Sequence, residues 1–287
     1  MKMIKKLVAA VLVLVILLGG VAVGGYFYVK NTYGIDLIKT VKQLKTLSAP
    51  VNESELCPHA FSSSDMVDVQ EIVNQSVENF ISYSEEHGYQ VDFENLPSEM
   101  KQVIKITDKQ VGALAQTVVQ QETGGKLEFS GKQLGVALKQ VQFSNIDANG
   151  NAKLNSVICV DITPFKAEMP EKFPFSYLKK FVPDALYISS TVFVEKGETA
   201  FSYQVSHDAL TINYLNKEDT EDLFNTLDIL LSVGSAQAWN EKMGGAIANA
   251  LIGDEQNNGI AYSLQEIGAT DYAFVQENGV DYFSVLR

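Results

Sequence analysis

Cysteine, histidine and acidic side chains are the groups in this sequence that could bind metals or do acid-base chemistry. Cys57-Pro58-His59 brings two metal-binding side chains together. Zinc needs four protein ligands, or three and a water molecule, and no second pair follows at ligand spacing. The many acidic pairs, such as Glu221-Asp222, are what a solvated surface carries. We therefore expect no metal site and no cofactor.

His207, which is followed by Asp208, is the candidate for a general base in a hydrolase. It lies between two predicted strands, where a surface turn is the ordinary explanation. The sequence contains no G-x-S-x-G, S-x-x-K or H-E-x-x-H motif, and the serines of residues 62–64 suit a helix cap better than a nucleophile. We predict no catalytic residue and no enzyme. A hydrolase that uses His207 with an unidentified nucleophile is the least favoured alternative.

A possible calcium loop begins at Asp147. Asp147, Asn149 and Asn151 alternate as oxygen ligands do at the start of such a loop. Ala152 stands where the loop requires glycine, and Ile158 stands where it requires a bidentate glutamate. The cluster therefore predicts a hairpin turn.

Cys57 and Cys159 are the two cysteines and lie 102 positions apart. In an oxidising compartment they could form a disulfide that closes a long loop. Alternatively, Cys159 is a small apolar residue in the predicted strand around Val157-Ile158-Cys159-Val160. The sequence leaves the pairing open.

The elements that would position these groups follow an apolar segment. Residues 7–29 form an unbroken apolar run of 23 positions behind Lys2, Lys5 and Lys6. As a helix this run would be about 35 Å long, which is enough to span a bilayer. A cleaved signal peptide is the alternative, but the length of the run and its aromatic end, residues 26–28, favour an uncleaved transmembrane signal-anchor.

The anchor divides the chain into four parts. Residues 1–6 are predicted as a cytoplasmic tail, 7–29 as the transmembrane helix, 30–50 as a juxtamembrane helix and linker, and 51–287 as an extracytoplasmic domain. Lysines flank both ends of the span, so the positive-inside rule alone does not decide the topology. Long domains translocate largely regardless of charge, which favours a single-pass cell-membrane protein with its C-terminal domain outside. Gly20 and Gly24 match the small-xxx-small pattern of a helix pair in lipid and would permit a homodimer.

Residues 35–47 show a helical rhythm with leucines on one side and Lys39, Lys42 and Lys45 towards the other. The lysines could contact anionic lipid headgroups. The helix could equally pack on the base of the domain, and the sequence supports both arrangements.

Charge excludes two classes of function. Residues 1–50 carry seven lysines and one aspartate, and because the whole chain is −13, residues 51–287 carry −19. Such a domain repels nucleic acid. Arg287 is the single arginine, so the domain has none of the guanidinium clamps that recognise phosphate esters.

Hydrophobic periodicity predicts an α+β domain with antiparallel strands. Alternation of Leu186, Ile188, Val192 and Val194 indicates a strand with one buried face. Helices are expected over 65–83, from Thr107 to Gly124, after Asn216 and over 236–251, and strands over 138–146, 152–163, 186–194, 201–205 and on both sides of Asn278-Gly279.

Gly244 and Gly245 fall in the middle of the last predicted helix. Glycine costs about 1 kcal/mol against alanine at such a position. The pair indicates tight internal packing, and a bound ligand or a break between two shorter helices are the alternatives.

The anchor, the lysine-bearing stalk and the elements over 106–232 resemble single-pass, membrane-anchored extracytoplasmic proteins of Gram-positive bacteria. Some of those are similar to tubular lipid-binding folds, in which a twisted sheet wraps a helix around an apolar channel. The resemblance implies a non-enzymatic binding module near the membrane, for an apolar or envelope ligand or for a protein partner. A structural or assembly partner of an envelope complex is the alternative.

Overall fold

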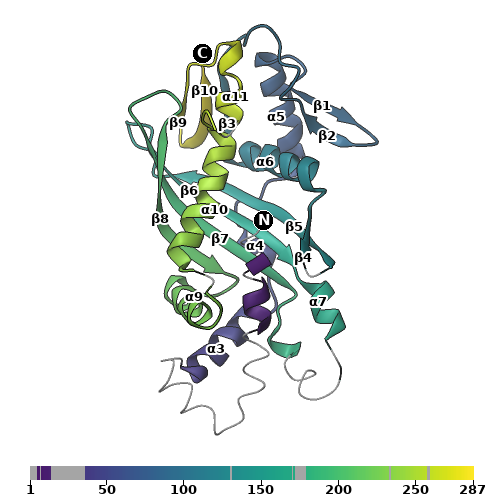
Figure 1. The fold of residues 1–287 in the computed structure, drawn as a ribbon. Coiled ribbons are helices and arrows are strands. Elements are labelled where there is room, and N and C mark those ends of the chain that lie inside the picture. The colour runs from purple at the N-terminus through teal and green to yellow at the C-terminus, as the bar shows by residue number, and fades with distance from the viewer. Residues whose placement is uncertain are drawn as a thin grey trace.

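A computed structural model describes residues 5–6, 8–13, 36–129, 131–169, 171, 179–232, 234–256 and 259–287. The fold is α+β with antiparallel sheets, as predicted. Within the described residues, strands pair in the orders β4-β5-β6-β7-β8, β3-β10-β9 and β1-β2 (Figure 1). The large sheet lies at the centre of the molecule, and the small sheets lie towards one end.

The strands have short loops between most neighbours. Their bounds are β1 (Ile81–Ser84), β2 (Gly88–Val91), β3 (Ile104–Thr107), β4 (Lys126–Phe129), β5 (Lys132–Ser144), β6 (Ala152–Asp161), β7 (Ala185–Lys196), β8 (Tyr203–Ile212), β9 (Asp271–Glu277) and β10 (Val280–Leu286).

Helices cover the sheets and connect them. Their bounds are α3 (Leu37–Leu47), α4 (Glu53–Leu56), α5 (Ser63–Ser76), α6 (Asp108–Thr123), α7 (Thr163–Glu168), α9 (Lys217–Leu231), α10 (Ala236–Leu251) and α11 (Ile260–Ser263), with short 3₁₀ turns η1 (Lys179–Phe181) and η2 (Gln265–Ile267).

One face of the large sheet is apolar and carries the helices. Every second residue of β7, from Leu186 to Val194, is buried on this face, which confirms the predicted alternation. Helix α10 packs on β7 and β8, and α6 packs on β5. The opposite face is more polar, and Phe193 on it is 38% exposed.

Gly244 lets α10 lie against the sheet. A Cβ atom at this position would be 2.4 Å from Cγ1 of Val192, whereas one at Gly245 would meet nothing within 4 Å. The helix continues through both glycines. Close internal packing, the explanation that the sequence favoured, therefore holds for Gly244.

Two hydrophobic cores lie at opposite ends of this face. The first is enclosed by α5, α6, α11, the three-stranded sheet and one end of the large sheet. The second is enclosed by α3, α9, the first half of α10 and the other end of the large sheet. The large sheet thus joins two packed ends.

Local capping and turn signals place several elements correctly. The Thr107 hydroxyl accepts from the backbone N–H of Gln110, and the side-chain oxygen of Gln110 accepts from the backbone N–H of Thr107. This is the reciprocal pair of a capping box, as predicted. Asn278 and Gly279 have φ angles of 52° and 77° and join β9 to β10, as expected for an Asn-Gly hairpin.

The predicted helix over 65–83 is too long. Helix α5 ends at Ser76, and the chain then turns into β1. The Asn74 side chain stabilises the turn, because its amide accepts from the N–H of Ile81 at 2.9 Å and donates to the carbonyl of Ile81 at 2.7 Å. Val77 and Phe80 follow the helix and are buried. Their spacing continues the apolar pattern of the helix, although the chain there is no longer helical.

Most of the predicted transmembrane helix, including Gly20 and Gly24, lies outside the described residues. Residues 8–13 are helical, and Val8, Ala10 and Val11 are buried in the second core. Within the described ranges, none of the helices is both long and apolar enough to cross a bilayer. The anchor over 7–29 stays a prediction.

Helix α3 packs against α9. Leu44 and Leu47 are fully buried, Gln43 Nε2 donates to the carbonyl of Asp219 at 3.0 Å, and Lys39 forms an ion pair with Asp222. Of the two arrangements that the sequence allowed for this helix, packing on the base of the domain is the one observed.

Candidate functional site

An open cleft of about 610 Å³ lies between the β1–β2 hairpin and helix α6. We call it the hairpin cleft. It is lined by Glu86, His87, Gly88, Tyr89, Gln90, Gln116, Thr117, Gln120 and Gln121. Figure 1 shows the hairpin at the end of the molecule opposite α3. The volume lies within the range of small-molecule sites.

Helix α6 supplies one wall of the cleft. Residues 111–114, in the first half of the helix, are buried. Gln116 and Gln120 are four residues apart, as are Thr117 and Gln121, and side chains at this spacing share a face of an α-helix. The helix therefore presents three amides to the hairpin, while the Thr117 hydroxyl donates within its own helix to the carbonyl of Ala113 at 3.0 Å.

The hairpin supplies the other wall and is attached to α6 by Gln121. The Gln121 side-chain oxygen accepts from the N–H of Val91 at 3.0 Å, and its nitrogen donates to the carbonyl of Val91 at 3.2 Å. Val91 and its cross-strand partner Ile81 are buried in the first core. The hairpin is thus fixed at its base while its tip stays over the cleft.

Two tyrosines form an aromatic surface near the tip. Tyr83 and Tyr89 are cross-strand partners, and their ring centroids are 4.9 Å apart. Tyr83 is 60% exposed, and Tyr89 lines the cleft. Gly88 has a φ of 69°, a conformation that glycine adopts without a steric penalty, and so permits the turn.

The cleft has hydrogen-bonding groups beyond those that hold the fold. Gln116 accepts from the N–H of Leu138 through its oxygen at 2.7 Å, which leaves its amide nitrogen as a donor. Gln90 donates to the carbonyls of His87 and Tyr89, which leaves its oxygen as an acceptor. Each amide side chain can both donate and accept. The carboxylate of the lining belongs to Glu86, which is exposed and lies 3.8 Å from the exposed His87 ring.

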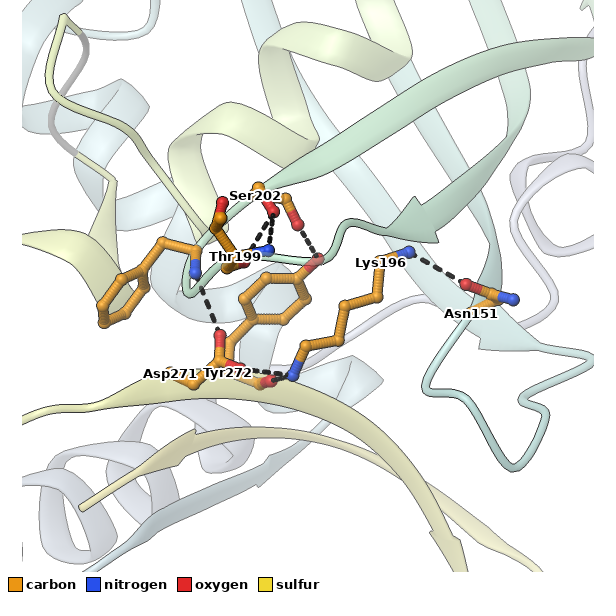
Figure 2. A network of polar contacts seen from close by, with 7 residues as sticks. Asn151, Lys196, Thr199, Ser202, Asp271 and Tyr272 are labelled. Atoms are coloured by element: carbon orange, nitrogen blue, oxygen red, sulfur yellow. Dashed lines mark hydrogen bonds and ion pairs between the residues drawn. The ribbon is translucent and has the colours of Figure 1, made fainter.

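A second hollow of about 570 Å³ lies between the β5–β6 turn and strand β9. It borders a polar network that we call the Lys196 junction, made of Asn151, Lys196, Thr199, Phe201, Ser202, Asp271 and Tyr272. Lys196 Nζ is 2.6 Å from Asp271 Oδ2 and donates to the Tyr272 carbonyl at 2.7 Å (Figure 2). The Tyr272 hydroxyl donates to the Ser202 carbonyl at 3.2 Å. The junction ties the β7–β8 loop to β9.

The electrostatics of the junction are balanced internally. The side chains of Lys196 and Asp271 are 21% and 24% exposed. Burial acts to raise the pKa of Asp271, but the hydrogen bonds from Lys196 and from the N–H of Phe201 outweigh it, and the pKa is lowered overall. The two charges of this junction therefore form an ion pair with each other, and this pair holds the large sheet and the three-stranded sheet together.

Asp147 stabilises the turn in which it lies, as the sequence indicated. Its carboxylate accepts from the N–H groups of Asn149 and Asn151 and from the Asn151 side chain at 2.8–3.0 Å. These bonds lower the pKa of Asp147, with the Asn151 N–H the largest contribution. Among the described residues, no three His, Cys, Asp or Glu side chains come together in a way that could hold a metal ion.

His207 lies within strand β8 and not in the surface turn that the sequence predicted, and among the described residues its ring is hydrogen-bonded to a buried amide. Its Nδ1 is 2.8 Å from Asn240 Nδ2, and its Nε2 is 3.9 Å from Glu221 Oε1. The Ser190 hydroxyl donates to Asn240 Oδ1 at 2.7 Å, and Ser190 and Asn240 are fully buried. A nucleophile and its base must be hydrogen-bonded to each other, and this hydroxyl bonds the amide instead.

Comparison with protein-family models, with curated proteins and with solved structures gives no match to this chain. Of the residues weighed from the sequence, His59 contributes its backbone N–H to Gln140, and Cys57 and Cys159 lie in one cluster on the polar face of the large sheet. None of these residues lines the hairpin cleft.

Sequence reasoning missed the cleft because it missed the hairpin. The polar stripe of Gln116, Thr117, Gln120 and Gln121 is visible in the sequence once α6 is predicted. Only a hairpin over 81–91 turns that stripe into a wall, and its four-residue strands are too short for a clear alternation.

Proposed function

We propose that this chain is a membrane-anchored, extracytoplasmic, non-enzymatic binding module that takes a neutral, hydroxyl-rich ligand of the cell envelope in the hairpin cleft. The ligand class is a saccharide. The observation that carries the proposal is the lining of the cleft: amides beside a tyrosine ring, with Glu86 and His87 as exposed neighbours.

This lining matches the chemistry of a sugar. Sugar hydroxyls donate and accept hydrogen bonds, as do the amides of Gln90, Gln116 and Gln120. The apolar C–H face of a sugar ring can pack on an aromatic ring such as Tyr89. A phosphorylated ligand fits poorly, because the lining contains neither lysine nor arginine.

The tubular lipid-binding alternative has less support. It requires an apolar channel between helix and sheet, and in the described residues α10 packs directly on the sheet at Gly244 and Val192. A polar ligand is therefore favoured over an acyl chain.

The position of the cleft relative to the predicted anchor is consistent with a ligand in the cell envelope. The predicted anchor precedes α3, and the β1–β2 hairpin, which forms one wall of the cleft, lies at the opposite end of the molecule (Figure 1). An anchor at the α3 end would direct the cleft away from the bilayer and towards the envelope. Protease added to whole cells should degrade the domain; a domain that stays intact until the cells are lysed would refute the extracytoplasmic location.

Binding is tested with the full chain in detergent micelles and a panel of neutral and charged oligosaccharides, by calorimetric titration. We expect saturable binding of a neutral oligosaccharide. The double variant Gln116→Ala/Gln120→Ala should weaken it about tenfold, because two hydrogen bonds of roughly 0.5–1.5 kcal/mol each are lost.

The matched control is Gln237→Ala, which removes an exposed helical glutamine on α10 that donates to Glu241. It should leave the affinity unchanged. Absence of saturable binding by every neutral oligosaccharide, or an equal loss in the control variant, would refute the proposal.

A further inference from the structure

A small third cluster lies on the polar face of the large sheet and contains both cysteines. Cys57 is buried together with Val157 and Tyr187, and Cys159 packs against them. Cys159 and Tyr187 are cross-strand partners in β6 and β7. Both thiols are free in this structure. The fold therefore gathers two cysteines that are 102 positions apart in the chain.

The backbone on both sides of Cys57 is attached to the strands that surround Cys159. Before it, the Glu53 carboxylate accepts from the Tyr187 hydroxyl at 3.0 Å and pairs with Lys139 at 3.0 Å. After it, the N–H of His59 donates to Gln140 Oε1 at 2.9 Å. These contacts hold the segment of residues 53–59 over β5, β6 and β7 and fix Cys57 at the sheet.

We propose that Cys57 and Cys159 form an intramolecular disulfide when the protein meets a thiol–disulfide oxidant, and that this bond fastens the segment of residues 53–59 to β6. The modification is independent of the ligand proposed for the hairpin cleft. It would form in an extracytoplasmic compartment and be reversed by reducing thiols.

A small disulfide such as oxidised glutathione can act as the oxidant. The thiolate of Cys159, the more exposed cysteine, attacks one glutathione sulfur and releases one glutathione thiolate. The thiolate of Cys57 then attacks Cys159 Sγ in the mixed disulfide and releases the second. Two protein thiols are oxidised, one glutathione disulfide is reduced to two thiols, and the two protein protons pass to the released thiolates.

The burial of the two thiols favours a stable structural disulfide over a rapidly exchanging one. Burial raises the pKa of Cys57 to about 11 and also raises the pKa of Cys159. Few thiolates are then present at neutral pH, and thiolates are the attacking species. Formation should therefore be slow at pH 7 and accelerate with pH, unlike the rapid exchange of a catalytic dithiol.

The loop that this bond closes contains the elements that build the hairpin cleft. Residues 57–159 include α5, the β1–β2 hairpin and α6. A crosslink around them restricts the unfolded chain, so the oxidised protein should resist heat better than the reduced protein.

The test uses the full chain in detergent micelles, equilibrated with oxidised glutathione at pH 8.5, denatured, and treated with a thiol-alkylating reagent. Intact mass should show one monomeric species that has lost two hydrogen atoms and carries no label. Its melting temperature should exceed that of the reduced protein by roughly 10 °C. Labelling of both thiols at equilibrium, or disulfides found only between chains, would overturn the proposal.

A matched variant tests placement rather than thiol number. Ser54 is exposed on α4, so Cys57→Ser/Ser54→Cys keeps two thiols and moves one out of the cluster. This variant should stay reduced within the chain or accept glutathione on each thiol. Intramolecular closure as complete as in the natural sequence would refute the assignment of Cys57 as the partner set by the fold.

Discussion

The hairpin cleft and the Lys196 junction differ in how they use their polar groups, although the two hollows have similar volumes. At the junction, Lys196 and Asp271 satisfy each other and bridge two sheets. In the cleft, Gln116 and Gln90 each retain a group that no described residue bonds. A polar hollow whose charges are paired internally stabilises the fold, whereas one with unused amides can accept a ligand.

Lys196→Met, at the junction, should have the largest effect on stability. The change leaves the mostly buried Asp271 carboxylate without its cation, which costs about 3 kcal/mol of unfolding free energy. Urea denaturation measures it. Lys109→Met, at an exposed lysine on α6, should change stability by less than about 0.5 kcal/mol. If both variants unfold at the same urea concentration, the junction does not stabilise the fold.

Gln121→Ala should have a smaller and more local effect. It removes two hydrogen bonds to Val91 at a partly exposed site, and we expect a loss of about 1 kcal/mol. Hydrogen exchange of the amides in β2 should accelerate more than that of β6, because the hairpin loses its attachment to α6. Unchanged exchange in β2 would mean that the buried side chains Ile81 and Val91 alone hold the hairpin.

The smallest effect concerns pH. The pKa of Asp271 is lower in the folded protein than its ordinary value of 3.8. Its contribution to stability is therefore complete above pH 3.8 and is lost as pH falls through the folded value. The difference in urea midpoint between the natural protein and Asp271→Asn should shrink between pH 5 and pH 3. A constant difference over this interval would show that the carboxylate charge does not matter.

The sequence predicted the elements whose signals lie within a few residues. The caps at Thr107 and Asn216 and the turn at Asn278-Gly279 are encoded locally, and the structure has all of them. The long strands β5, β6 and β7 were also identified, because one of their faces is apolar. Strand β8 was wrong in its extent, since it continues to Ile212 through His207 and Asp208, where the sequence predicted a turn. Strands of four residues, such as β1 and β4, give too short a pattern to recognise.

The candidate site could not be read in the same way. Gln121 and Val91 are 30 positions apart, and no local sequence pattern predicts the hydrogen bond between them. The role of His207 likewise depends on Asn240, which is 33 positions away. Contacts of this kind follow from the arrangement of α6, α10 and the sheets, which periodicity does not specify.

The contact between Gly244 and Val192 has an evolutionary consequence. The two positions share one volume, so a larger residue at 244 requires a smaller one at 192. In homologous sequences these positions should covary, while position 245, which faces open space, should accept alanine or a polar residue independently. A homologue with alanine at position 192 should accept alanine at 244 more readily, because the contacts with the two methyl groups of Val192 would be gone and the contact with its Cβ at 3.0 Å would remain.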